Sequence, residues 1–435
     1  MDYINYIFKI LQIIEQFYWQ YIGIIIIIFC GIFFTFKAKF LQFKALPNII
    51  NFFKSIYKEG LQNNRGINPI KLIFASTGGM IGVGNVVGVG SAILIGGPGA
   101  FLWLWVGVIF GSLIKYCEIY LSISTRVSNK IQSYDGGLMF YIIEAFNIKF
   151  LAKVAAVLLC IYSIEIYQFT VIVDTINTVC PSVEKYIIVL GLLLLILYSS
   201  SGGIKRISAI CSIIMPIFLS LYIIIGSWII FINTNSFFVL FKEIFYSALN
   251  GQSAIGGFVG SSILLTAYNG IARSVYAGDI GIGYDSIVHS ESSAKDPKQQ
   301  GILAIYCLLL NAIICSVSML MIIVTQTWQS TFTYHSEAIP NIFNEYLWCG
   351  QYFMAFILFF AGFTTVISFL TIGIKSFNYL FNSNNTNIYL WIASIILVIF
   401  AYVPQEKVML IMSICSGMLL LINISAIIKL RDRIK

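Results

Sequence analysis

The stretch Phe74–Gly99 constrains this chain more than any other. It reads FASTGGMIGVGNVVGVGSAILIGGPG, is apolar over a length that can cross a bilayer, and contains nine glycines. Glycine in a helix interior costs about 1 kcal/mol relative to alanine, so this span is either packed very closely against its neighbours or interrupted. We predict an interruption at Gly82, Val83 and Gly84, beside the amide of Asn85, and we predict that the break is a binding site.

Composition places the chain in the membrane. Of its 435 residues, 59% are hydrophobic and 10% are charged, whereas soluble domains carry about 25% charged residues. The apolar runs are continuous rather than alternating, which predicts helices and not a barrel. The fold class is therefore an all-α polytopic membrane protein. Eleven spans are expected, at residues 18–36, 70–96, 99–124, 152–179, 186–200, 207–231, 254–277, 301–325, 350–380, 388–403 and 407–428.

The basic residues predict the orientation. They cluster in the loop after the first span and in the tail 430–435, and lysine and arginine favour the cytoplasmic side. Eleven spans then put the N-terminus outside and the C-terminus in the cytoplasm. Residues 1–17 are amphipathic and are expected to lie at the membrane interface. The net charge of +8 is thus explained by topology, without a nucleic-acid partner.

A second glycine-rich span, residues 254–277, follows the first by five spans. An odd spacing reverses the direction of insertion, so two five-helix repeats of opposite orientation are expected, each with a broken helix. Paired interrupted spans of this kind are typical of transporter binding sites, although glycines also permit close helix packing. We divide the chain into 1–66 (interfacial helix, first span and basic loop), 67–232 and 254–429 (the two repeats) and 430–435 (the tail).

Several polar side chains inside the spans could carry chemistry. A broken helix frees amide groups for a carboxylate and carbonyl groups for a cation, and the adjacent hydroxyls of Thr364 and Thr365 suit Na⁺ unless they bond back to their own helix. Glu165 is either a proton-titrating group or a paired structural residue. Two further groups are interpreted as structural: a Lys115–Glu118 pair, and an inner-gate cluster of Arg273, Asp279 and Asp285.

Four stretches together resemble the alanine/glycine:cation symporters over residues 60–425. They are GMIGVGNVVGVGSAILIGGPGAFLWLWVGVIFGSLIKYCEIYL, IYSIEIYQF, GQSAIGGFVGSSILLTAYNGIARSVYAGDIGIGYDSIVHSESSAKDPKQQG and FFAGFTTVISF. The resemblance implies the inverted-repeat fold of neurotransmitter:sodium symporters plus one extra N-terminal helix. It also implies sodium-coupled import of a small neutral amino acid, alanine or glycine, across a bacterial plasma or inner membrane.

The resemblance also implies site residues. Sodium would lie against Gly78, Ile81, Ala361, Thr364 and Thr365. The amino acid would lie against Gly82, Val83, Gly84, Asn85, Gln168, Gly256, Gly257, Phe258 and Phe369, with a second helix break at Gly256–Phe258.

This chain departs from the family pattern at the proposed pocket. Val83 replaces a threonine, Phe369 a tryptophan, Asp279 a glutamate, and Glu165 a neutral amide. The last change leaves proton coupling open as an alternative to sodium, and a passive channel or exchanger is a second alternative. Neither a phosphate-binding loop nor a catalytic constellation within the spans is found, so ATP and enzymatic activity are not expected, and no cofactor is expected beyond the coupling ion.

Overall fold

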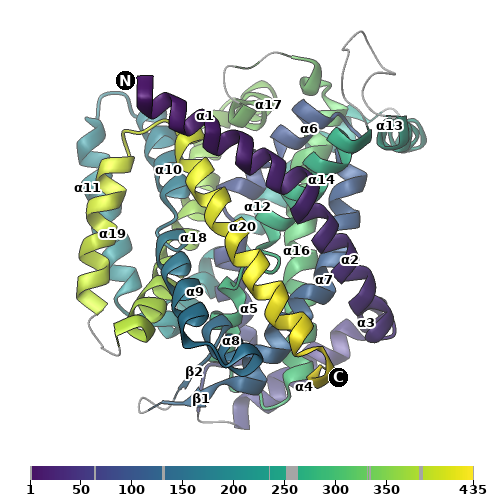
Figure 1. The fold of residues 1–435 in the computed structure, drawn as a ribbon. Helices are drawn as coiled ribbons and strands as arrows, with labels where there is room; N and C mark the ends of the chain where they lie inside the picture. Colours follow the sequence, from purple (N-terminus) through teal and green to yellow (C-terminus); the bar gives the residue numbers. More distant parts are fainter. Residues whose placement is uncertain are drawn as a thin grey trace.

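The computed structural model describes residues 2–62, 65–129, 133–234, 236–250, 263–330, 332, 335–381 and 386–434. Long helices lie side by side in a bundle, and the two ends of the chain lie at opposite ends of it (Figure 1). A short antiparallel hairpin of β1 (Val127–Ser128) and β2 (Tyr134–Asp135) lies at the end near the C-terminus. The all-α prediction is confirmed.

The N-terminal segment differs from expectation. Helix α1 (Asp2–Phe17) continues through the π-helical turn η1 (Tyr18–Gly23) into α2 (Ile24–Lys37), because the junction residues keep right-handed helical angles. Residues 1–17 are thus the start of a longer helix rather than a separate one. The Tyr18 hydroxyl donates to the Gly417 carbonyl at 2.7 Å and fixes this helix against α20 (Gln405–Lys429).

Helices lie at most of the predicted span positions, but the predicted count of eleven spans is not confirmed. Within the described residues, seven helices are long and apolar enough to cross a bilayer, or eight with one bent pair. Two shorter helices, α11 (Lys185–Ser200) and α19 (Thr386–Phe400), fall at the expected spans 186–200 and 388–403. The remaining elements are α3 (Leu41–Ala45), η2 (Leu46–Asn48), α4 (Ile49–Gln62), α7 (Ala100–Thr125), α8 (Leu138–Phe146), α11 (Lys185–Ser200), α12 (Gly203–Asn233), α13 (Phe237–Asn250), α16 (Pro297–Val324), η5 (Thr327–Gln329), η6 (His335–Glu337), α17 (Ala338–Tyr346), α18 (Gly350–Phe381), α19 (Thr386–Phe400) and η7 (Arg431–Arg433).

Within the described residues, three spans are interrupted. The first break separates α5 (Pro69–Met80) from the π-turn η3 (Gly84–Gly88) and α6 (Gly90–Gly96), with a bend of 56°. The second separates α9 (Lys149–Tyr162) from α10 (Ile166–Val179), and the third separates α14 (Ile263–Gly278) from α15 (Tyr284–Ser290). The break expected at Gly256–Phe258 lies outside the described residues, and the break after α14 is one that sequence reasoning missed.

The first and third broken spans run in opposite directions. Helix α6 packs against α14, and α5 packs against α15, so the first half of each span meets the second half of the other. The Thr266 hydroxyl donates to the Gly96 carbonyl at 2.8 Å, and the Tyr284 hydroxyl donates to the Ala75 carbonyl at 3.0 Å. This crossed pairing is what two oppositely oriented repeats require.

Gly79 provides the closest approach between these two spans. A Cβ atom at Gly79 would lie 1.9 Å from the Tyr284 hydroxyl oxygen. The tyrosine ring cannot move aside easily, because it stacks on Phe369 with 4.1 Å between ring centroids. The absence of a side chain at residue 79 therefore allows α5 and α15 to meet.

We expect Gly79→Ala to lower stability by about 1–3 kcal/mol, the usual range for overpacking, and to lower the melting temperature of the detergent-solubilised protein. Gly191→Ala is the matched control, since a Cβ there meets nothing within 4 Å and alanine favours a helix by up to about 1 kcal/mol. Equal melting temperatures for the two variants would contradict this packing.

Candidate functional site

The break after α5 is satisfied by two side-chain amides. The Gly82 N–H donates to Asn85 Oδ1 at 3.0 Å, and the Val83 N–H donates to Gln168 Oε1 at 2.8 Å. Unpaired backbone groups in a bilayer cost several kcal/mol each, so these two bonds stabilise the unwound segment. The two N–H groups predicted to face a ligand therefore have protein acceptors in this structure.

Asn85 also joins the broken spans to α16. Its Nδ2 donates to the Ala277 carbonyl at 3.1 Å and to Asn311 Oδ1. The backbone carbonyl of Asn85 accepts from Ser318 Oγ at 3.1 Å. Sequence reasoning did not single out Asn311 and Ser318. The sequence signal that could have identified this contact was the amide side chain of Asn311 inside the apolar run of residues 301–325.

The predicted sodium ligands are brought together in part. Thr365 Oγ1 lies 3.2 Å from the Gly78 carbonyl and 3.0 Å from the Ala361 carbonyl. Thr364 Oγ1 bonds back to its own helix, at 2.9 Å from the Phe360 carbonyl and 3.1 Å from that of Ala361. Carbonyl and hydroxyl oxygens are the donors that an alkali cation prefers, so this group fits Na⁺. Ile81, also predicted, is buried at the end of α5.

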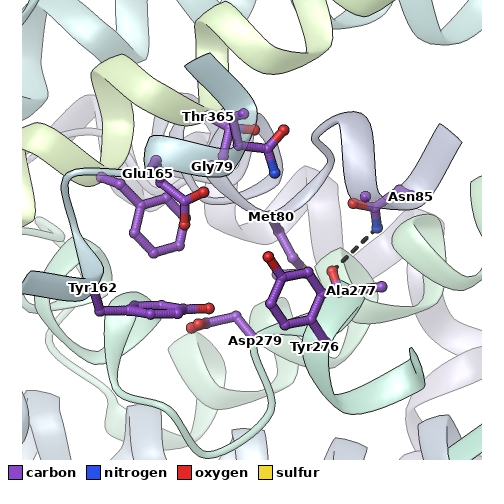
Figure 2. Close-up of a pocket in the computed structure, with 12 residues that line it drawn as sticks. Gly79, Met80, Asn85, Tyr162, Glu165, Tyr276, Ala277, Asp279 and Thr365 are labelled. Carbon is purple, nitrogen blue, oxygen red and sulfur yellow. Dashed lines mark hydrogen bonds between the residues drawn. The ribbon is translucent and has the colours of Figure 1, made fainter. Parts of the chain in front are cut away.

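A pocket opens beside these residues, between the three broken spans (Figure 2). It is lined by the sodium candidate Thr365 and by five of the residues predicted to bind substrate or a proton: Gly84, Asn85, Glu165, Gln168 and Phe369. Gly82 and Val83 do not line it, and the Val83 side chain is directed toward Gly362 on α18. The lining comprises Gly79, Met80, Gly84, Asn85, Tyr162, Glu165, Gln168, Tyr276, Ala277, Asp279, Thr365 and Phe369.

Sequence reasoning missed the pocket wall formed by the third break. Tyr276, Ala277 and Asp279 lie at the end of α14 and in the turn that follows it. Asp279 adopts a left-handed conformation with φ of 47°, and Gly281 and Gly283 have φ of 72° and 114°. Glycine tolerates such angles at no steric cost, so the GxG spacing after the aspartate was the usable signal.

Lys115 is the centre of a buried charge cluster. Its Nζ lies 2.8 Å from Asp285 Oδ2 and 3.5 Å from Asp279 Oδ2. Glu118 instead accepts from the Ser286 N–H at 3.2 Å and from Asn423 Nδ2 at 3.2 Å. The predicted Lys115–Glu118 pair is therefore wrong, since both carboxylates of the third broken span compete for the lysine.

Arg273 does not belong to that cluster. It lies on α14, before the third break, and its guanidinium donates to Ser91 on α6, which follows the first break. The predicted group of Arg273, Asp279 and Asp285 is thus corrected to the two aspartates with Lys115.

These features define a class of protein. Two oppositely oriented broken helices that meet around one buried pocket are the architecture of inverted-repeat secondary transporters. In agreement, the fold is similar to the nucleobase-cation symporter Mhp1 in a closed conformation, with a TM-score of 0.55 and 11% identity over 81% of this chain and 75% of that one. It is also similar to a Na⁺-coupled sialic acid symporter in an outward-open state, with a TM-score of 0.53 and 12% identity over 88% and 81%.

The chain belongs to the sodium:alanine symporter family, whose model matches residues 4–435. It is 24% identical to the probable sodium/glutamine symporter GlnT of Bacillus subtilis, over 96% of this chain and 87% of that protein. It is also 24% identical to the sodium/alanine symporter AgcS of Methanococcus maripaludis, over 89% and 86%. Identity to the sodium/proton-dependent alanine carrier protein of Bacillus sp. PS3 is 25%, over 74% and 76%.

We expect Lys115→Met to destabilise the protein by about 3–5 kcal/mol, because it leaves buried carboxylates without their cation. The control is Lys185→Met, which removes a half-exposed pair with Asp174 worth at most about 1 kcal/mol. Thermal unfolding in detergent measures both. A Lys115 variant as stable as the Lys185 variant would show that the buried cluster is not held by this lysine.

Proposed function

We propose that this protein is a secondary active symporter that couples Na⁺ entry to the uptake of a small neutral amino acid, alanine or glycine. The observation that carries the proposal is the Gly78–Ala361–Thr365 oxygen group directly beside the pocket at the first helix break. The family supports the ion and the class of substrate. The proposed location is a bacterial plasma or inner membrane, with the N-terminus outside and the C-terminus in the cytoplasm.

Sodium would act by joining two parts of the bundle. Its carbonyl ligand from Gly78 belongs to a broken helix, whereas Thr365 and Ala361 belong to the continuous helix α18. A cation held between them favours the state in which both are close, and a ligand shifts such an equilibrium by its differential affinity for the two states. Substrate and sodium that favour the same state raise one another's affinity reciprocally.

The substrate would bind across the first break. Its carboxylate would displace the side-chain oxygens of Asn85 and Gln168, which line the pocket. It would then accept from the amides of Gly82 and Val83, which those oxygens cover in this structure. Phe369 limits the length of the side chain, because it closes the pocket and is held by Tyr284. The predicted contribution of Gly256, Gly257 and Phe258 belongs to this proposal as an expectation.

Proton coupling is the second candidate, and Glu165 is the observation that favours it. Its side chain is 3% exposed and lines the same pocket, so it could carry a proton through the transport cycle. The passive channel or exchanger remains the alternative in which no gradient drives uptake.

Uptake of labelled alanine and glycine into proteoliposomes, with sodium and proton gradients imposed separately, tests these alternatives. We expect an inward sodium gradient to drive accumulation above equilibrium, because entry of the ion supplies the free energy. Stimulation by a proton gradient alone would favour Glu165 as the coupling group. Equilibration without accumulation under either gradient would mean a passive pathway and would refute the proposal.

We expect Thr365→Val to raise the sodium concentration for half-maximal uptake about tenfold or more, since the variant loses a ligand oxygen worth about 1.5–3 kcal/mol. Thr371→Val is the matched control, because that hydroxyl bonds back to the Ile367 carbonyl of its own helix, at 3.0 Å. Sodium dependence of uptake measures both. An unchanged sodium requirement in Thr365→Val would exclude this residue as a ligand.

A further inference from the structure

Two acidic side chains face the pocket, and the sodium site does not use them. Glu165 is 3% exposed and Asp279 is 1% exposed, and both line the pocket. Glu165 Oε2 and both carboxylate oxygens of Asp279 accept no hydrogen bond from the described part of the chain. Figure 2 shows the two residues on the side of the pocket away from Asn85.

Each of these carboxylates lies at the joint of a broken helix. Glu165 has φ of 53° between α9 and α10, and Asp279 has φ of 47° between α14 and α15. The joints turn the two side chains toward one space, together with Tyr162 and Tyr276.

The protein itself neutralises this pair poorly. Lys115 Nζ donates to the backbone carbonyl of Asp279 at 2.6 Å, but it lies 3.5 Å from the Asp279 carboxylate and binds the Asp285 carboxylate more closely, at 2.8 Å. The ion pairs of the described chain include none with Glu165. A carboxylate buried within a membrane bundle is costly unless a cation approaches it, so the pocket is electrostatically prepared for a positive group.

We propose that Glu165 and Asp279 form the subsite for the substrate's ammonium group. This inference rests on the proposed function and assigns the second end of the amino acid. The carboxylate of a zwitterion replaces the Asn85 and Gln168 oxygens at the Gly82 and Val83 amides. Its ammonium lies on the side of the pocket away from Asn85, against the two acids (Figure 2). The pocket then matches the substrate's dipole, and recognition requires a primary amine.

The chemistry of the pair favours an ammonium over a second metal ion. An ammonium offers three N–H donors, which two carboxylates and neighbouring hydroxyls can accept. Within the described residues, no three His, Cys, Asp or Glu side chains come together in a geometry that could hold a metal. The alternatives to an ammonium at this pair are a second sodium ion and a bound proton, and uptake by the variants distinguishes them.

Sodium-driven alanine uptake by proteoliposomes tests the subsite, with Glu165→Gln and Asp279→Asn as isosteric neutral variants. We expect each to raise the KM for alanine about tenfold or more, as the loss of a charged hydrogen bond implies, with an unchanged sodium requirement at saturating alanine. L-Lactate, which carries a hydroxyl in place of the ammonium, should compete poorly in the wild type. The control is Glu144→Gln, an exposed acid paired with Arg433, with an unchanged KM.

A rise in melting temperature on adding sodium shows that a purified variant is folded. If one of the two variants does not fold, the other still tests the subsite. An unchanged KM in both would overturn the subsite alone. So would a Glu165→Gln variant that loses only stimulation by a proton gradient, or one that loses only a second, cooperative sodium. A wild-type protein without sodium-driven uptake would overturn the proposed function and this inference together.

Discussion

The structure depends on how backbone hydrogen-bonding groups are satisfied where helices break within the bundle. A bilayer supplies no water to an unwound segment, so every interruption needs partners from elsewhere in the chain. At the first break these partners are the amides of Asn85 and Gln168. The Asn85 side chain also donates to the Ala277 carbonyl and to Asn311 on α16. One side chain therefore joins the first and third broken spans to a continuous helix. The pocket exists because the chain supplies these bonds itself.

Much of this architecture could be predicted from sequence. Continuous apolar runs and clustered basic residues predict the spans, and the glycine-rich stretch with Asn85 predicts the first break. The two threonines of α18 were found by chemistry, and the structure separates them: Thr365 reaches across to Gly78, whereas Thr364 bonds to its own helix. Adjacent residues on a helix point about 100° apart, so the pattern could indicate the pair but not which member faces the partner.

The third broken span shows what sequence reasoning missed and why. Glycine density predicted a break at Gly256–Phe258, which lies outside the described residues and stays a prediction. It did not indicate the break that the structure places after Gly278, around Asp279 and Gly281. Glycine content alone does not distinguish close packing from a left-handed turn. Likewise, a spacing of three on one helix suggested the Lys115–Glu118 pair. The actual partners, Asp279 and Asp285, come from a span more than 160 positions away, which no local pattern can reveal.

The internal bonds at Gly82 and Val83 bear on the half of a transport cycle in which the carrier travels back without cargo. With Asn85 and Gln168 as acceptors, the unloaded protein keeps the break satisfied from within, so an empty pocket imposes no penalty for stranded backbone groups. The same arrangement sets a threshold for cargo. A ligand gains only the difference between the hydrogen bonds that it makes and those that it displaces, which weakens retention and thereby favours release on the far side.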